Sequence, residues 1–473
     1  MGGMSSQVPS PDRSPSVSLS RRGVILSSAA LAFSGFGAWS ARAAEGGVIN
    51  EVRGYGPLRP DPARILDLPE GFSYRVLSSA GETMDDGFLA PDHFDGMGCL
   101  ELPDGRLALM RNHELDPDES RLGPSGGRPE LEARLSGVPA FDRRPDGRVL
   151  PGGVTTLIVN PKTGEMERQY LSLAGTLVNC AGGVTPWGAW LTCEETMISA
   201  PRTLSSHGWI FEVPATAEGP VTPVPLVAMG RFRHEAAAVD PGTGVVYLTE
   251  DRDDGLLYRF LPRTPGRLAD GGRLQALVLE GGTDSRNWRR ADMSVGETRS
   301  VGWIDLDGVE APADDLRIRG HAAGAALFAR GEGVHLGPRP GGGSEIFFSC
   351  TSGGSRRLGQ IFRLVPGAEG GGDVIQLFVE PTDPRVMDYG DNLVVAPWGH
   401  LVVCEDRVGL RLNHLKGVTP EGRVYTLARL HMRTELAGAC FSPDGRTLFV
   451  NAYSPGRPFA ISGPWAEVSD AAT

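Results

Sequence analysis

Metal-ligating side chains recur at a fixed distance from a repeated turn that contains proline. The positions six residues before the turn proline are Met97, Cys180, Glu235, Glu332, Asp391 and Ala437. The positions that end the apolar segment after each turn are Glu114, Glu194, Glu250, Cys350, Glu405 and Asn451. Carboxylates suit hard ions such as calcium, whereas the thiolate of Cys180 suits a softer or redox-active ion such as iron or zinc. The pattern therefore indicates a metal centre.

The turn recurs six times, and each copy predicts a β-hairpin. The turn prolines are Pro103, Pro186, Pro241, Pro338, Pro397 and Pro443. Proline presets a turn, glycine supplies positive φ, and the apolar segments on either side have the length and composition of strands. The copies lie roughly 45 to 100 residues apart, which is typical of the four-stranded units of a propeller. We therefore predict an all-β fold, a six-bladed β-propeller formed as a single domain by residues 44–473.

The two sets of side chains are expected to meet at one mouth of the propeller axis, because the innermost strands line the central channel. A single glutamate at a strand end is as readily explained by contact with solvent. Many carboxylates in one narrow channel repel one another, and they stay ionised together only with cations among them. The register therefore predicts a metal site on the central axis. Its predicted ligands are Cys180, Glu235, Glu332, Asp391, Glu194, Glu250, Glu405 and Glu114.

Cys180 is the most informative of the six cysteines, because it stands within the acidic register. Cys193 and Cys404 each precede a glutamate of that register, so the alternation of a strand turns them away from the channel and packing explains them. Cys99 and Cys440 belong to the first and last repeats, and whether they form a disulfide stays open.

Arg330 is the arginine best placed for a role at the predicted site. It stands two residues before Glu332, and the alternation of a strand puts both on one face. A guanidinium there either binds a phosphate oxygen through two parallel hydrogen bonds or pairs with a carboxylate of the site. The sequence contains no Ser-His-Asp set, P-loop or dinucleotide fingerprint.

The N-terminus and the net charge bear on where the protein works and what it meets. Ser20-Arg21-Arg22 begins a twin-arginine pattern, and Ala41-Arg42-Ala43 is an Ala-x-Ala cleavage site. We predict a twin-arginine signal peptide over residues 1–43, export by the Tat machinery, and a periplasmic or secreted protein. The formal net charge of -12 disfavours nucleic acid and anionic membranes as partners. The oligomeric state stays open, with a monomer as the simplest expectation.

Several segments resemble the PhoX-type alkaline phosphatases. They are Asn112-His113-Glu114, Asn179-Cys180-Ala181-Gly182-Gly183, Thr185-Pro186-Trp187-Gly188, Arg231-Phe232-Arg233-His234-Glu235 and the run from Ala437 to Gly445. The resemblance extends over nearly all of the mature chain. It implies a six-bladed propeller with iron and calcium ions in the central channel, and hydrolysis of phosphomonoesters at alkaline pH in the periplasm or outside the cell.

The resemblance also implies roles for individual residues. The family's iron-binding cysteine matches Cys180, and its phosphate-contacting arginine matches Arg330. Its metal-binding acids match Glu235, Glu332 and Asp391, with Asn392 close by. Asn392 therefore joins the predicted metal ligands, Arg330 is the predicted catalytic residue, and calcium and iron are the predicted cofactors.

The predicted function is that of an exported metal-dependent phosphoester hydrolase, an alkaline phosphatase that acts on small-molecule phosphomonoesters. In the predicted reaction the cations neutralise the phosphate oxygens, Arg330 adds to that clamp, and a metal-bound oxygen nucleophile attacks phosphorus. Two alternatives stay open. One is a calcium-dependent lactonase on a similar propeller, and the other is a non-catalytic exported propeller that binds a partner on its rim.

Overall fold

The structure is a computed structural model that describes residue 2 and residues 47–339, 341–367 and 372–472. The predicted signal peptide lies outside the described residues, residue 2 apart, and it stays a prediction. Contacts group Gly47–Thr473 as one unit. No helix in the described parts of the chain has the length and apolarity needed to cross a bilayer.

Six antiparallel hairpins form at the six predicted turns. They are β5 (Phe94–Glu101) with β6 (Leu107–His113), β9 (Asn179–Val184) with β10 (Ala189–Glu194), β12 (His234–Val239) with β13 (Val246–Glu250), β17 (Gly331–Pro338) with β18 (Ser344–Cys350), β21 (Gly390–Val395) with β22 (Leu401–Glu405), and β25 (Leu436–Phe441) with β26 (Thr447–Ala452). The turn residues Gly105 and Gly399 have φ values of 81° and 91°, which lie in the left-handed region that glycine adopts without strain.

Further strands extend these hairpins into sheets. The added strands are β7 (Gly152–Val159) and β8 (Met166–Thr176); β11 (Ile210–Pro214); β14 (Leu257–Pro262), β15 (Gly272–Leu279) and β16 (Thr298–Asp305); β19 (Gln360–Val365) and β20 (Asp373–Val379); β23 (His414–Val418), β24 (Val424–Leu430), β3 (Leu66–Pro69) and β2 (Leu58–Arg59); and β27 (Arg457–Ser462) with β4 (Ser73–Val76). Strand β16 joins β15 to β20, and a separate pair is formed by β1 (Val52–Gly54) and β28 (Ser469–Ala472).

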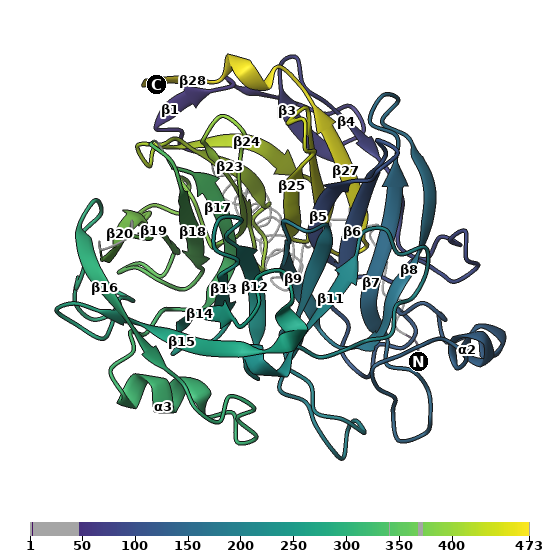
Figure 1. The fold of residues 1–473 in the computed structure, drawn as a ribbon. Helices are drawn as coiled ribbons and strands as arrows, with labels where there is room; N and C mark the ends of the chain where they lie inside the picture. The colour runs from purple at the N-terminus through teal and green to yellow at the C-terminus, as the bar shows by residue number, and fades with distance from the viewer. Residues whose placement is uncertain (1, 3–46, 340, 368–371, 473) are drawn as a thin grey trace. The chain divides into compact units, whose positions relative to one another are not determined.

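The innermost strands surround a common centre. Strands β5, β9, β12, β17, β21 and β25 contact one another in that order, and β25 returns to β5. Figure 1 shows the sheets placed around this centre. Strands from the two ends of the unit share sheets, because β4 pairs with β27 and β3 pairs with β24. The result is a mostly β, propeller-like arrangement.

Within the described residues, the helices are short and occupy connections between strands. They are α2 (Pro129–Leu135), α3 (Leu316–Ala322) and the 3₁₀ helices η1 (Val227–Met229), η2 (Leu268–Asp270) and η3 (Trp465–Glu467). The core consists of apolar clusters between neighbouring sheets. In one of them Phe328 packs against Phe348 and Phe362, with ring centroids 5.2 and 5.3 Å away.

Glycine lets the inner strands approach one another closely. A Cβ on Gly183 would lie 1.9 Å from the carbonyl oxygen of Ala237, and one on Gly333 would lie 2.8 Å from Cα of Asn392. Neither distance leaves room for a side chain. The close approach holds β9 against β12 and β17 against β21.

All six cysteines are buried and unpaired. Cys99 and Cys440 belong to one apolar cluster together with Met97 and Phe449, but no disulfide joins them. Cys193 and Cys404 pack into apolar clusters between their own sheets and the neighbouring ones, which agrees with a packing role.

Candidate metal centre

The inner hairpins contain β-bulges at the end opposite their turns. In β5, for example, the register shifts between Phe94 and Met97. A bulge sets two residues against one on the partner strand and re-aims a side chain. In five hairpins the residue that follows the last regular pair is acidic or a thiol: Asp95, Cys180, Glu235, Glu332 and Asp391.

These side chains and four others form one continuous group. Four sets of three residues have ligating atoms that all lie within 4.8 Å of one another: Asp95, Glu114 and Cys180; Cys180, Glu195 and Glu235; Glu235, Glu332 and Asp391; and Asp391, Asp406 and Glu435. Each set shares one member with the next, so the twelve places hold nine residues. We call these nine residues the acidic cluster. It contains five of the predicted ligands, namely Cys180, Glu235, Glu332, Asp391 and Glu114.

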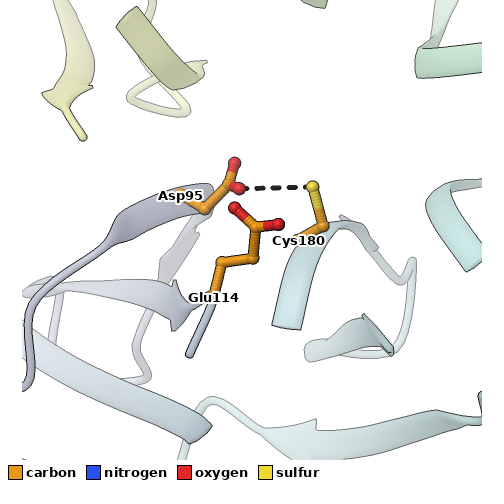
Figure 2. Close-up of side chains that lie close together, drawn as sticks. All are labelled: Asp95, Glu114 and Cys180. Carbon is orange, nitrogen blue, oxygen red and sulfur yellow. Dashed lines mark hydrogen bonds between the residues drawn. The ribbon is translucent and has the colours of Figure 1, made fainter. Parts of the chain in front are cut away.

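One end of the acidic cluster is formed by Asp95, Glu114 and Cys180. Figure 2 shows their side chains directed toward one another from β5, the end of β6 and β9. The Cys180 thiol donates a hydrogen bond to Oδ2 of Asp95 at 3.2 Å. Burial and the charge of Glu114 hold the pKa of Asp95 well above its usual range. Burial and the charge of Asp95 likewise raise the pKa of the Cys180 thiol, and a cation at this position would reverse both shifts.

Glu235 stands at the middle of the acidic cluster and tests whether the cluster fits a metal. Its side chain is fully buried, and neither carboxylate oxygen has a hydrogen-bond partner among the described residues. Burial and the charge of Glu332 raise its pKa well above the usual range. Buried carboxylates without protein partners are expensive unless they coordinate a metal. The donor set, oxygens with one sulfur, fits cations of the calcium and iron kind.

Arg330 lies beside this middle part of the acidic cluster. Its backbone has a φ of 56°, a conformation that side chains other than glycine rarely adopt. Its Nε and Nη2 donate to the two oxygens of Asp251 at 2.7 and 3.0 Å, and Nη2 lies 2.8 Å from Oε1 of Glu332. The sequence left two roles open for Arg330, binding a phosphate oxygen and pairing with a carboxylate. The two roles are compatible, because only one edge of the guanidinium pairs with carboxylates. The other edge, Nη1, makes no hydrogen bond to a described residue.

Asn392, a further predicted ligand, lies beside the acidic cluster, and its Nδ2 donates a hydrogen bond to Oδ1 of Asp391 at 3.5 Å. Its side-chain oxygen accepts a hydrogen bond from the backbone of Gly438 at 2.7 Å, which links β21 to β25.

Next to the acidic cluster lies a cavity of about 350 Å³. Its lining includes the small or amide residues that directly follow five cluster residues on the inner strands: Gly96, Ala181, Ala236, Gly333 and Asn392.

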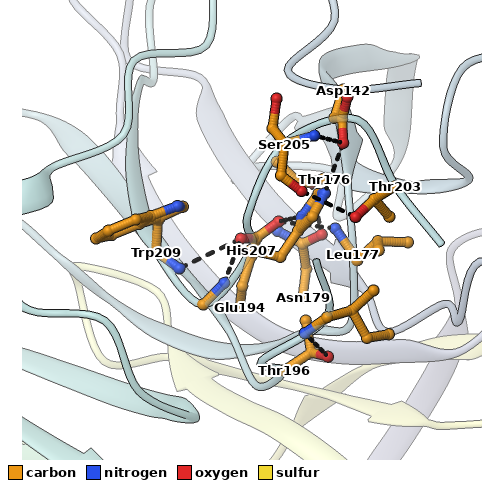
Figure 3. A network of polar contacts seen from close by, with 12 residues as sticks. Asp142, Thr176, Leu177, Asn179, Glu194, Thr196, Thr203, Ser205, His207 and Trp209 are labelled. Atoms are coloured by element: carbon orange, nitrogen blue, oxygen red, sulfur yellow. Dashed lines mark hydrogen bonds and ion pairs between the residues drawn. The ribbon is translucent and has the colours of Figure 1, made fainter. Parts of the chain in front are cut away.

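Glu194, a further predicted ligand, lies outside the acidic cluster and is fully buried among protein partners (Figure 3). Its Oε1 accepts hydrogen bonds from the backbone of Leu177 at 2.9 Å and from Nδ1 of His207 at 2.7 Å. Its Oε2 accepts from the backbone of Gly208 at 3.0 Å and of Trp209 at 3.2 Å. No lone pair remains free for a metal, and the following residue, Glu195, belongs to the acidic cluster instead.

Glu250 and Glu405 also lie outside the acidic cluster. Glu405 has hydrogen-bond donors on both oxygens, whereas Oε1 of Glu250 has no hydrogen-bond partner among the described residues. Glu250 accepts a hydrogen bond from the hydroxyl of Tyr258 at 2.7 Å. Glu405 accepts from Nδ1 of His414 at 2.8 Å and lies 3.8 Å from the buried ammonium of Lys416. The residue after Glu405 is Asp406, a member of the acidic cluster. The physical reason is alternation, since consecutive side chains at a strand end point in opposite directions.

Sequence reasoning missed four members of the acidic cluster, namely Asp95, Glu195, Asp406 and Glu435. A shift of one residue past each strand end would have found Glu195 and Asp406. Asp95 was missed because β5 has eight residues where β9 has six, so counting back from the turn proline reaches Met97. Glu435 directly precedes β25 and has no counterpart in the other repeats.

Comparison with known proteins places the chain in a family. A search of curated proteins found no match. Among solved structures, Pseudomonas fluorescens PhoX in complex with vanadate, a transition state analogue, is 20% identical, with 88% of this chain and 97% of that chain covered and a TM-score of 0.64. This likeness shows a shared fold. A gluconolactonase from Xanthomonas campestris (14% identical, covering 86% of this chain and 98% of that chain) and a putative 6-phosphogluconolactonase from Bacteroides uniformis (12%, covering 80% and 89%) each have a TM-score of 0.38.

The family model described as alkaline phosphatase PhoX matches residues 53–456, which is most of the chain. The match confirms the resemblance drawn from the sequence and favours a phosphatase over both alternatives, the lactonase and the non-catalytic propeller. The chain therefore belongs to the alkaline phosphatase PhoX family of phosphomonoesterases.

Proposed function

We propose that this protein is an exported phosphomonoesterase whose acidic cluster holds calcium and iron on the axis of a six-bladed β-propeller. The observation that carries the proposal is Glu235, a fully buried carboxylate without a protein partner, at the middle of nine ligating side chains. The acidic surface, with a formal net charge of -12, makes local positive charge necessary for an anionic substrate.

Six blades are supported by the six inner hairpins and by the closed order of contacts among their first strands. The bulges lie at one end of these strands, so their side chains converge where the strands approach the centre. This convergence supports a metal site on the axis.

The residues that would hold the cations follow from the donor atoms. The thiol of Cys180, flanked by Asp95 and Glu235, is the place for iron, because a thiolate favours a softer ion than calcium. The part of the acidic cluster made of oxygens alone, from Glu235 through Asp391 to Glu435, suits calcium. Bound cations would supply the positive charge that neutralises phosphate oxygens, and they lower the pKa of water.

Arg330 would hold the scissile phosphate against this centre. Asp251 and Glu332 fix the guanidinium plane through three contacts of 2.7 to 3.0 Å, and the free Nη1 edge remains to donate to a phosphate oxygen. A planar guanidinium held in this way loses little further entropy when it binds. Asp251 is therefore a positioning residue for Arg330.

Export through the Tat machinery and a periplasmic or secreted location remain part of the proposal. Their support is the twin-arginine pattern and the Ala41-Arg42-Ala43 cleavage site in the sequence. Cleavage after Ala43 would leave residues 44–473 as the mature enzyme.

The test is turnover of p-nitrophenyl phosphate at alkaline pH by the purified protein, with calcium and after chelation, beside elemental analysis for iron and calcium. We expect turnover to require calcium and to fall at least about 100-fold in Cys180→Ala and Glu332→Ala, since even residues that only orient metal ligands cost 10- to 100-fold. Cys193→Ala, which changes a buried cysteine of an apolar cluster, is the matched control. Full activity after chelation and in both variants would refute the proposal.

A further inference from the structure

The rim beside Arg330 carries an aromatic ring and several arginines that the proposed reaction does not use. They are Arg286, Trp288 and Arg289, after β15, and Arg356 and Arg357, after β18. Arg289, Arg356 and Arg357 are exposed, and their side chains make no ion pair with a described carboxylate. Positive charge gathered on a protein with a formal net charge of -12 favours an anionic ligand at that place.

Hydrogen bonds attach this rim directly to Arg330. The backbone of Thr351 donates to the carbonyl of Arg330 at 3.1 Å, and its hydroxyl donates to Oε1 of Glu332 at 2.8 Å. The carbonyl of the next residue, Ser352, accepts a hydrogen bond from Nε1 of Trp288 at 2.6 Å. The indole is thus anchored one residue along from the backbone partner of Arg330.

The two segments of the rim are also bonded to each other and to the approach to Arg330. The backbone of Ser285 donates to the carbonyl of Leu327 at 3.1 Å, three residues before Arg330, and the backbone of Gly354 donates to the carbonyl of Arg286 at 2.9 Å. The segments that carry Trp288 and Arg357 are therefore hydrogen-bonded to each other and to the backbone on both sides of Arg330.

Arg357 is held on the Trp288 ring with its hydrogen-bond donors unused. Its guanidinium lies 4.1 Å from the ring centroid, and no hydrogen bond from its side chain to a described residue exists. Arg286 also lies over the ring, at 4.5 Å, but it is engaged by both oxygens of Asp284 and by the carbonyl of Asp253. The ring orients Arg357, and the fork of that guanidinium remains available to an anion.

Besides Asp284, which pairs with Arg286, the carboxylates of Asp253 and Glu380 lie at the same rim and have partners of their own. Asp253 accepts a hydrogen bond from the hydroxyl of Ser352 at 3.2 Å. Glu380 accepts hydrogen bonds from the side chains of Asn287 and Gln360 and from the backbone of Ser355. Neither carboxylate pairs with Arg357.

We propose that Arg357, supported by Trp288, binds a second anionic group of the substrate, so that this enzyme prefers phosphomonoesters whose leaving group carries a further phosphate. The inference rests on the proposed function, because Arg330 must hold the phosphate that is cleaved. The second phosphate makes no bond and breaks none; it fixes the leaving group in place on the rim.

The first measurement compares kcat/KM for butane-1,4-diol bisphosphate with kcat/KM for butyl phosphate, in the metal-loaded enzyme. We expect the ratio of the two values to fall about tenfold in Arg357→Ala, as one good charge-assisted contact is lost. Arg357→Lys, which keeps the charge without the planar fork, is expected to lose part of the ratio. Arg446→Ala, an arginine with an 87% exposed side chain at a hairpin turn far from the rim, leaves the ratio unchanged. An unaltered ratio in Arg357→Ala overturns the inference.

The second measurement does not need turnover. Calorimetric titration with butane-1,4-bisphosphonate and with butylphosphonate, which lack a cleavable ester bond, gives the preference for the second anionic group in each variant. We expect tighter binding of the bisphosphonate by the wild type and loss of that preference in Arg357→Ala. If the protein cleaves neither ester but still binds the bisphosphonate more tightly in a way that depends on Arg357, the proposed function is refuted and the second anion subsite is supported. Equal binding of both ligands by the wild type would refute the subsite, whatever the turnover.

Discussion

Consecutive residues at the ends of the inner hairpins have opposite electrostatic surroundings. Glu194 accepts four hydrogen bonds from the chain itself, whereas Glu195, the next residue, faces Cys180 and Glu235 in the acidic cluster. Glu405, which accepts a hydrogen bond from His414, and Asp406, which belongs to the acidic cluster, show the same contrast. We refer to Glu194, Glu250 and Glu405 as the strand-end glutamates.

The comparison of these neighbouring acids shows that burial alone does not make a carboxylate a metal ligand. Burial opposes ionisation of Glu405, yet the charges of Lys416 and His414 lower its pKa below the usual range. Burial and the charge of Asp251 raise the pKa of Glu195 well above it. Glu194 and Glu405 thus have protein donors on both oxygens, and Glu250 has donors on one oxygen only. The acidic cluster needs bound cations to offset most of its negative charge. A buried acid therefore indicates a metal where other acids crowd it and the protein offers too few donors and positive charges to offset them.

The largest effect is expected from Glu194→Ala. The substitution leaves His207 and three backbone N–H groups buried without their acceptor, and removal of one partner from a buried pair costs about 3–5 kcal/mol of unfolding free energy. Urea denaturation measures the loss. The exposed Glu165→Ala (side chain 68% exposed) is the control and is expected to change stability by less than about 0.5 kcal/mol. Loss of bound metal without loss of stability would instead make Glu194 a ligand.

Glu235→Gln is expected to act on activity rather than on folding. The change removes a charge from the middle of the acidic cluster, so kcat/KM for p-nitrophenyl phosphate should fall about 100-fold, equivalent to about 2.7 kcal/mol. The metal-free variant should be at least as stable as the metal-free wild type, because a repelling buried charge is gone. Stopped assays and chemical denaturation after chelation measure the two effects. A large loss of stability in the metal-free variant would place Glu235 with the strand-end glutamates.

The fold could be predicted from sequence because its signals are local. Each turn carries proline, and glycine at positions such as Gly105 and Gly399, and these residues fix the hairpins. Closure of the ring could not be predicted in detail. It depends on pairing between β4 and β27, which are separated by almost the whole unit, and such pairings leave no periodic mark on the sequence.

Much of the site could be located from sequence to within one residue, with Asp95 and Glu435 as the exceptions. Cys180, Glu235, Glu332 and Asp391 follow from the turn register because their strands have a constant distance from turn to bulge. The strand-end glutamates were chosen over their neighbours because the pattern does not say which of two adjacent acids points inward. That choice depends on partners such as His207 and Lys416, which stand on other strands and loops and are visible only in three dimensions.

The strand-end glutamate Glu194 also predicts a dependence of stability on pH. His207 lies between Glu194 and Asp142, with its Nε2 3.2 Å from Oδ2 of Asp142. Burial opposes protonation, but the charge of Glu194 and the hydrogen bond to Asp142 raise the pKa of His207 to about 9 from its usual 6.5. The stabilisation is complete below pH 6.5 and is lost as pH rises through 9. It falls by about 2 kcal/mol between pH 7 and pH 9.

Urea denaturation at a series of pH values, with calcium fixed, measures this loss. His207→Gln keeps a hydrogen-bonding side chain without the titration, so its stability should be flatter over the same range. Identical pH profiles for the wild type and His207→Gln would show that His207 is neutral in the folded protein. Glu194 and Asp142 would then be a second group of buried carboxylates without a positive charge beside them, in addition to the acidic cluster.

The smallest effect concerns Glu250, the strand-end glutamate with the weakest compensation. Its Oε1 has no hydrogen-bond partner among the described residues, and burial raises its pKa to about 7. Tyr258→Phe removes the shorter of the two hydrogen bonds to Oε2, and the backbone of Leu256, at 3.3 Å, remains as a donor. We expect a cost of about 1.5 kcal/mol at pH 8.5, where the carboxylate is charged, and of about 0.7 kcal/mol at pH 5.5, where it is protonated, because hydrogen bonds to charged groups are the stronger ones. Tyr247→Phe, on the adjacent strand and without a carboxylate hydrogen bond among the described residues, controls for the loss of a buried hydroxyl. A cost for Tyr258→Phe that does not change with pH would mean that Glu250 stays in one protonation state throughout. The distinction between acids whose charge the protein offsets and acids whose charge it does not offset would then not apply to this hairpin.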